Sequence, residues 1–168
     1  STRSSSSAAS DVYKRQHPFP LINYVHKKMH VSYSKTYSRL QNGRPKLIFP
    51  NYSMGYPILD KDGILDVGGR SSYAIFVEND SVDTLKKIQD FFLTDLALTL
   101  INSLKTAQKF LSTRTFSLFP DVTKWTTPIN DESLATYFKL TTKEKLSIAH
   151  QKKQGEGNLN EKLSLIHI

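Results

Sequence analysis

The chain has 168 residues, with 23 lysine and arginine residues against 15 aspartate and glutamate residues, and a formal net charge of +8 at pH 7. This length suits a single domain with a real core. The sequence has no cysteine, which excludes a disulfide framework and a thiolate metal site and favours a reducing compartment, so we expect a cytoplasmic protein. No apolar run is long enough to span a membrane, and no membrane partner is expected.

The two ends of the chain can be encoded by one DNA sequence read in opposite directions. Residues 11–16 can be written GAT GTG TAT AAG AGA CAG, and the reverse complement of that sequence encodes residues 163–168. Such an inverted repeat resembles the adapter of a transposon-based sequencing library. We therefore expect residues 1–16 and 163–168 to be adapter-derived and non-native, residues 17–150 to form the domain, and residues 151–162 to be a polar tail. The natural protein is then expected to continue beyond this fragment.

Strands are predicted in the first half of the chain. They fall at Val31–Ser38, Lys46–Phe49, Tyr56–Leu59, Ile64–Val67 and Tyr73–Val77. The strands Tyr56–Leu59 and Ile64–Val67 flank Lys61-Asp62-Gly63 and predict a hairpin, because Asp-Gly supplies the positive φ that a tight turn requires. The short apolar run at Lys46–Phe49 is typical of a buried strand.

Helices are predicted in the second half. Asp80 or Ser81 can cap a helix from Val82, and Thr94-Asp95 begins a second helix. Thr113–Phe116 is predicted to be extended. Further on, Asn130 or Asp131 can cap a short helix, and Thr141 with Glu144 forms a capping box for a last one. Strands followed by helices predict an α+β fold, with a mainly antiparallel sheet meander, two or more packed helices and short C-terminal helices.

The basic residues are concentrated in two stretches that contain no acidic residue, His17–Leu59 and Leu96–Pro120. Aromatic residues are interleaved with the basic ones in the first stretch. Such stretches attract polyanions, since each neutralised phosphate releases counterions, and nearby tyrosines can contact sugars or phosphates. The alternative is a solvated basic face without a partner.

Two parts of the sequence contain residues that occur in metal sites. Asp60-Lys61-Asp62-Gly63 resembles the start of a calcium loop, but the later glycine and glutamate of that loop are missing. His26 and His30 have no third ligand nearby. No metal site and no catalytic residue is therefore predicted. The loop Gly68-Gly69-Arg70-Ser71-Ser72 offers amides, hydroxyls and a guanidinium that could bind a phosphate or a base edge; the alternative is a turn with an exposed arginine.

Several segments, taken in order, resemble the target-recognition region of adenine-specific DNA methyltransferases of the Eco57I class, which occur in restriction-modification enzymes. The matching pieces cover much of residues 35–150. They are Arg44-Pro45-Lys46-Leu47-Ile48-Phe49-Pro50-Asn51, Ile58-Leu59-Asp60-Lys61-Asp62-Gly63, Tyr73-Ala74-Ile75-Phe76-Val77, Leu100-Ile101-Asn102-Ser103, Phe116-Ser117-Leu118-Phe119-Pro120-Asp121, Trp125, and Leu134-Ala135-Thr136-Tyr137-Phe138-Lys139-Leu140-Thr141. Their order and spacing carry the resemblance.

The resemblance implies double-stranded DNA as the partner. Enzymes of this family bind S-adenosylmethionine at a glycine-rich strand end and hold the flipped adenine with an N-P-P-Y-type tetrapeptide, and neither motif occurs here. The implied arrangement is an upstream methyltransferase domain in the same natural chain, which would bind the cofactor. The present chain would bind no cofactor and would be inactive alone.

The residues expected to contact DNA fall into two groups. Lys46, Lys105, Lys109 and Arg114 are expected at the phosphate backbone, and Arg44, Asn51, Arg70 and Ser71 at base edges. The alternative is a basic protein-interaction or structural domain with no enzymatic role, which an exposed apolar stripe on the Val82–Leu104 helices would favour. Basic residues that converge on one concave face would favour DNA.

Overall fold

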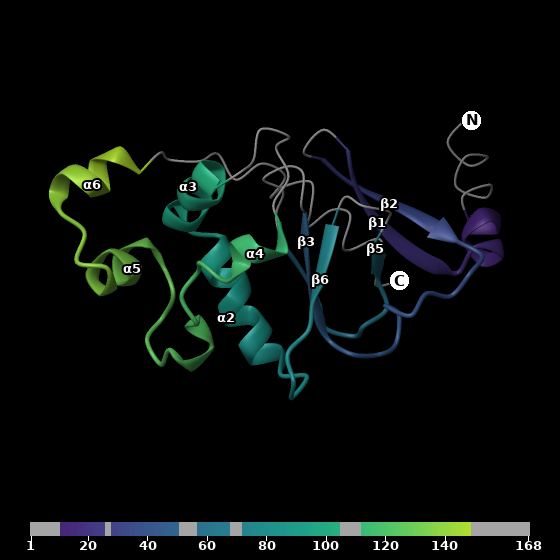
Figure 1. Ribbon diagram of the computed structural model, residues 1–168. Helices are drawn as coiled ribbons and strands as arrows, with labels where there is room; N and C mark the ends of the chain where they lie inside the picture. Colours follow the sequence, from purple (N-terminus) through teal and green to yellow (C-terminus); the bar gives the residue numbers. More distant parts are fainter. Residues whose placement is uncertain (1–10, 26–27, 51–56, 68–71, 105–111, 149–168) are drawn as a thin grey trace, which may run out of the picture.

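The computed structural model describes residues 11–25, 28–50, 57–67, 72–104 and 112–148 (Figure 1). Strands occupy the first half of the chain and helices the second, so the predicted α+β class is confirmed. In Figure 1 the strands gather on one side of the molecule and the helices on the other. Residues 11–16 form a short helix beside the first strands.

The described strands form two separate three-stranded sheets, where one meander was expected. In the first sheet, β1 (Phe19–Val25) pairs antiparallel with β2 (Lys28–Ser34) and parallel with the short β5 (Asp66–Val67). In the second sheet, β3 (Lys46–Pro50) lies between β4 (Ile58–Asp60) and β6 (Ser72–Ile75), and both pairings are antiparallel. Strand β3 overlaps the strand predicted at Lys46–Phe49, and β6 overlaps the one predicted at Tyr73–Val77.

The hairpin expected across Lys61-Asp62-Gly63 is wrong, because its two arms belong to different sheets: β4 pairs with β3, and β5 pairs with β1. The Asp60 carboxylate accepts hydrogen bonds from the amides of Ile64 and Leu65, at 3.2 and 2.9 Å. These bonds turn the chain away from β4 and direct it towards β1. The turn itself is present where it was predicted.

Gly63 is required at this turn for two reasons. Its φ is +64°, in the left-handed region that favours glycine, as the sequence predicted. A Cβ at this position would also lie 2.4 Å from the amide nitrogen of Arg44, because the two loops are in contact and the Gly43 amide donates to the Gly63 carbonyl. The turn therefore holds two loops from different parts of the second sheet together.

Two helices follow the sheets where the sequence predicted them. They are α2 (Val82–Phe92) and α3 (Asp95–Leu104). Ser81 is the cap of α2, since its hydroxyl accepts the amide of Thr84. The prediction that Thr113–Phe116 is extended is wrong: these residues form α4, a single helical turn after Ser112. Two β-branched threonines in this short segment favoured a strand, but the helical turn lets Phe116 pack against the other aromatic rings of the core.

The C-terminal helices begin at the predicted caps. They are α5 (Asp131–Tyr137) and α6 (Thr142–Ser147), preceded by the 3-10 turn η1 (Val122–Lys124). Capping boxes are present at Asn130 and Thr141. The carboxylate of Asp131 also accepts the amides of Asp95 and Leu96, at 3.1 and 3.0 Å, so the first turn of α5 caps the start of α3.

Two hydrophobic clusters hold the layers together. The larger lies between the second sheet and the helices, where Phe49 of β3 packs on Phe92 of α2 with ring centroids 4.6 Å apart. The smaller lies between the two sheets and joins Ile22 of β1 to Ile48 of β3. Each fully buried side chain of this size contributes about 1.5–3 kcal/mol to folding. The second sheet is therefore packed on both faces.

Candidate functional site

Lys46 was expected to contact the DNA backbone, and this expectation is wrong. Its side chain is fully buried, and Nζ lies 2.5 Å from Oδ2 of Asp60, which is 3% exposed. Nζ also donates to the carbonyl of Leu40 at 2.7 Å. A buried ammonium group needs such partners, because leaving it unpaired costs several kcal/mol, on the order of 3–5. Lys46 therefore joins β3 to β4 and to the loop at Leu40, and it has no access to a phosphate.

Arg44, expected at a base edge, lies at the surface but already has two partners. Its Nε and Nη2 donate to Oδ1 of Asp80, at 2.9 and 2.8 Å, and its guanidinium lies 5.0 Å from the ring centroid of Phe76. The hydrogen bonds from Arg44 to Asp80, together with the charge of that carboxylate, raise the pKa of Arg44. The arginine therefore clamps the loop before β3 against the loop after β6.

Arg114 lies exposed on α4, as a phosphate contact requires. Among the described residues, no acidic side chain forms an ion pair with it. The other predicted contacts, Asn51, Arg70, Ser71, Lys105 and Lys109, lie outside the described residues. The loop Gly68–Ser72 is described only at its last residue, which begins β6.

The described residues that flank these segments lie close together. Pro50, at the end of β3, is the direct partner of Ser72 at the start of β6, so these two strand ends are neighbours in the second sheet. The ring of Tyr73 lies 5.6 Å from that of Phe116, which places α4 beside the same end of the sheet. Arg44 lies just before Lys46, at the opposite end of β3. The two ends of this strand, Lys46 and Pro50, are about 13 Å apart. The structure thus separates Arg44 from the end of the sheet that adjoins Arg114.

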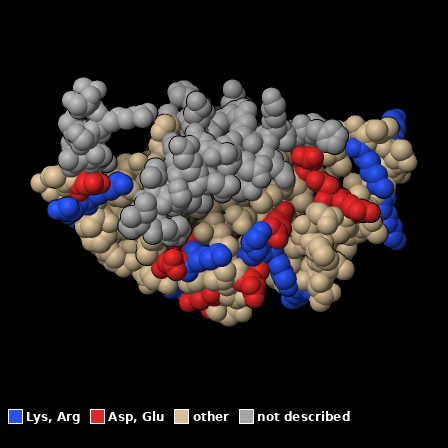
Figure 2. All heavy atoms as spheres, turned by 180° about the vertical axis from the view of Figure 1, so that it is seen from behind, with Lys and Arg blue, Asp and Glu red and all other residues tan. Residues whose placement is uncertain are grey.

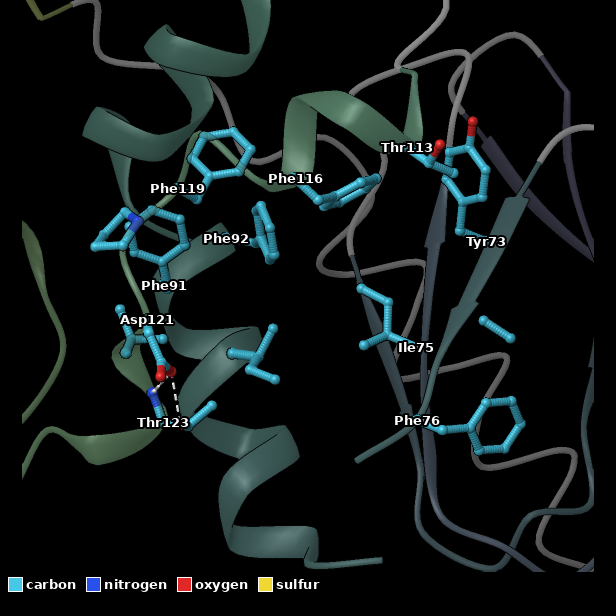
Figure 3. A pocket seen from close by; sticks show the side chains of 14 residues that line it. Tyr73, Ile75, Phe76, Phe91, Phe92, Thr113, Phe116, Phe119, Asp121 and Thr123 are labelled. Carbon is cyan, nitrogen blue, oxygen red and sulfur yellow. Dashed lines mark hydrogen bonds between the residues drawn. The ribbon is translucent and has the colours of Figure 1, made fainter. Parts of the chain in front are cut away.

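An aromatic cleft opens beside β6 (Figure 3) and has a volume of about 590 Å³. One wall is formed by Tyr73, Ala74, Ile75 and Phe76 of the β6 segment, and the other by residues of α2, α4 and η1. In Figure 3 the side chain of Ile75 points towards α2, and Phe76 points the other way. The volume and the mostly apolar lining of this cleft fall in the range typical of ligand-binding sites.

Asp121 lies at the rim of this cleft and is the one charged residue among the described residues that line it. Its Oδ1 accepts from both the amide and the hydroxyl of Thr123, at 3.1 and 2.5 Å. These two hydrogen bonds lower the pKa of Asp121, so the carboxylate is ionised at neutral pH. Oδ2 lies 4.0 Å from the exposed Lys124. Sequence reasoning missed the cleft because its walls come from three regions of the chain, and the helical turn of α4 was expected to be extended.

Charged side chains of both signs lie next to one another on the face shown in Figure 2. Besides the pairs at Arg44 and Lys124, Lys86 of α2 pairs with Asp90 one turn later. Three surface cations of the described part, Arg44, Lys86 and Lys124, therefore each have a carboxylate neighbour. Within the described part of the chain, no group of three or more histidine, aspartate or glutamate residues could hold a metal ion.

None of the described helices is long and apolar enough to cross a membrane. Comparison with protein-family models, with curated proteins and with solved structures finds no match to this chain.

Proposed function

We propose that this chain is a sequence-specific DNA-binding module, the target-recognition part of an adenine-specific DNA methyltransferase. Its contact surface lies where β3 ends, β6 begins and α4 starts. The resemblance described above assigns methyl transfer to a separate domain that binds S-adenosylmethionine. This module recognises duplex DNA and transfers no methyl group by itself.

One observation carries the proposal. Pro50, which precedes Asn51, pairs with Ser72, which follows Arg70 and Ser71, in the β3–β6 ladder. Helix α4, with its exposed Arg114, lies beside this end of the sheet. Two described residues far apart in sequence, Pro50 and Ser72, thus lie at one end of the second sheet. Arginine and asparagine are the side chains that pair with guanine and adenine edges, and cations nearby fix the backbone.

Binding of the full chain to fluorescein-labelled duplexes tests the proposal, with fluorescence anisotropy measured at several salt concentrations. Arg114→Ala should weaken binding to every duplex by a similar factor and reduce the slope of log K against log salt by about 1. Lys109→Ala should act in the same uniform way. Arg70→Ala should instead relax the preference among duplexes, because a lost base contact costs about 1–3 kcal/mol at its own position only.

Lys145→Ala on α6 is the matched control, because its side chain is exposed and lies on a different helix. It should leave both affinity and salt slope unchanged. Equal effects of Arg70→Ala and Lys109→Ala on all duplexes would remove the base-reading role. If Arg114→Ala and Lys145→Ala behave alike, the proposed surface is in the wrong place.

A further inference from the structure

We propose that the outward face of β1 and β2 lies in the major groove of duplex DNA, where Asn23 reads an adenine. This base contact rests on the proposed function and extends it, because neither strand contains any of the residues expected at the DNA. It adds a second contact to the one at the end of the second sheet.

Strands β1 and β2 form an antiparallel ribbon whose two faces differ. On the inner face, Ile22 and Val31 are direct partners and pack in the smaller hydrophobic cluster against β3. Successive side chains of a strand point to opposite faces, so Asn23, its direct partner His30, and Ser32 lie on the outer face. His30 is exposed, and Asn23 and Ser32 are half-buried. In Figure 1 the ribbon lies on the side of the second sheet away from the helices, so this face is accessible to a large partner.

One hydrogen bond orients the amide of Asn23. Its Nδ2 donates to Oγ of Ser32 across the ribbon at 3.0 Å, which fixes the direction of the amide and uses one of its two N–H groups. Within the described part of the chain, the second N–H and Oδ1 have no protein partner. They can therefore donate to N7 of an adenine and accept from its N6 amino group. This pair of bonds distinguishes adenine from the other bases in the major groove.

The dimensions of the ribbon also suit this groove. Strands β1 and β2 have seven residues each, so the ribbon is about 23 Å long. The major groove is about 12 Å wide and admits a two-stranded β-ribbon. Strand β5 pairs with β1 over only two residues, Asp66–Val67, so the sheet is two strands wide over most of its length.

The charges around the ribbon favour a polyanion as the occupant. Both strands lie wholly within the acid-free stretch His17–Leu59. Lys35, directly after β2, and Arg39 are exposed, and neither forms an ion pair with a described residue. Each can bind a phosphate beside the groove. Asp66 of β5 shares the outer face, because it is the register partner of Leu21. Its charge opposes DNA on the β5 side, so we expect the duplex to lie nearer β2.

Selection from a pool of duplexes with a randomised segment tests this contact. The full chain is incubated with the pool, and the bound fraction is sequenced. Asn23→Ala should reduce the preference for adenine at one position about tenfold. Asn23→Asp keeps the cross-strand bond, because the hydroxyl of Ser32 can donate to the new carboxylate. It should move the preference at the same position towards cytosine, whose N4 amino group donates to a carboxylate.

Asn102→Ala is the matched control, because it removes the same side chain from an exposed position on α3. It should leave the preference unchanged. Lys35→Ala should weaken binding to every duplex and lower the salt slope by about 1. Asp66→Asn should strengthen binding to every duplex about twofold, because it removes a repulsive charge. Circular dichroism reports whether each variant is folded.

The outcomes separate this contact from the proposed function. If the parent prefers a sequence and Asn23→Ala keeps that preference, the ribbon reads no base and this proposal alone is wrong. The same holds if Asn23→Ala weakens binding to all duplexes alike, since loss of a side chain that only stabilises the ribbon would do so. If the parent binds no duplex, or binds all duplexes equally, the proposed function fails and the ribbon contact fails with it.

Discussion

Lys46→Met is the most informative single change in this protein. Methionine has a similar length but no charge, so the substitution leaves the 3%-exposed carboxylate of Asp60 without its cation. The amides of Ile64 and Leu65 remain bonded to it, but the ammonium at 2.5 Å is lost. Removing one partner of a buried ion pair costs about 3–5 kcal/mol. A domain of this size has a total stability of about 5–15 kcal/mol, so the loss is large.

Urea unfolding, followed by the fluorescence of the single tryptophan, Trp125, measures this cost. With an m-value of about 2 kcal/mol per molar, the midpoint should fall by about 1.5–2.5 M. The double variant Lys46→Met/Asp60→Asn should recover about 1–2 kcal/mol, because no buried charge remains. The recovery is partial, since the two backbone amides bind different oxygens of Asp60 and the single amide oxygen of asparagine can accept only one of them. DNA affinity of folded Lys46→Met should equal that of the parent, since the side chain never reaches the surface.

Lys86→Met is the matched control for this experiment. Lys86 pairs with Asp90 on the surface of α2, where both side chains are partly exposed. Exposed pairs of this kind contribute about 0.3–0.5 kcal/mol. If Lys46→Met costs no more than Lys86→Met, the argument for a stabilising buried pair is refuted. A lowered DNA affinity of folded Lys46→Met would instead restore the original expectation of a phosphate contact.

Three further predictions concern turns and helix ends. Gly63→Ala should lower the free energy of unfolding by about 3 kcal/mol, because both its positive φ and the loop at Gly43 and Arg44 oppose a Cβ. Gly43→Ala should cost about 1 kcal/mol, because its φ is also positive but the space around it is open. Urea unfolding measures both changes. Hydrogen bonds from Thr141 lower the pKa of Glu144 below its ordinary value of 4.5. The cap of α6 should therefore be fully stabilising above pH 4.5 and be lost as the pH falls through the lowered pKa of the folded state. The NMR shift of the Thr141 amide reports this loss, and Glu144→Gln should abolish the pH dependence. Asp131→Ala should cost about 1–2 kcal/mol and speed hydrogen exchange at the start of α3, and unchanged exchange there would contradict the bridging role.

Helix starts were the most predictable part of this fold. The sequence offered Asp80 or Ser81 as one cap, Asn130 or Asp131 as another, and Thr141 as the third. In the structure Ser81, Asn130 and Thr141 each cap a helix through their own side chains. Capping depends on residues three or four positions apart, so the sequence contains the whole interaction. The three- and four-residue spacing of Leu85, Ile88 and Phe92 likewise indicated the inner face of α2, where Leu85 and Phe92 are buried.

Strand partners and side-chain environments were much less predictable. The Asp-Gly turn predicted a bend at Gly63 but not that Asp60 would redirect the chain into another sheet. Lys46 was counted among the surface cations because its carboxylate partner is 14 residues away and approaches only when β3 and β4 pair. Both errors have one cause: pairing between distant segments decides them, and local patterns do not contain it.

The contact between Asp131 and the first amides of α3 has a practical consequence for dissecting this protein. A shortened chain that stops before residue 131 would keep every amino acid of α3 and the Thr94 hydroxyl that accepts the Ala97 amide, but it would lose the carboxylate that accepts the amides of Asp95 and Leu96. Its remaining part should fray from the Asp95 end and open the hydrophobic layer beneath. Any minimal folded fragment must therefore include α5, even for studies that concern only the sheets.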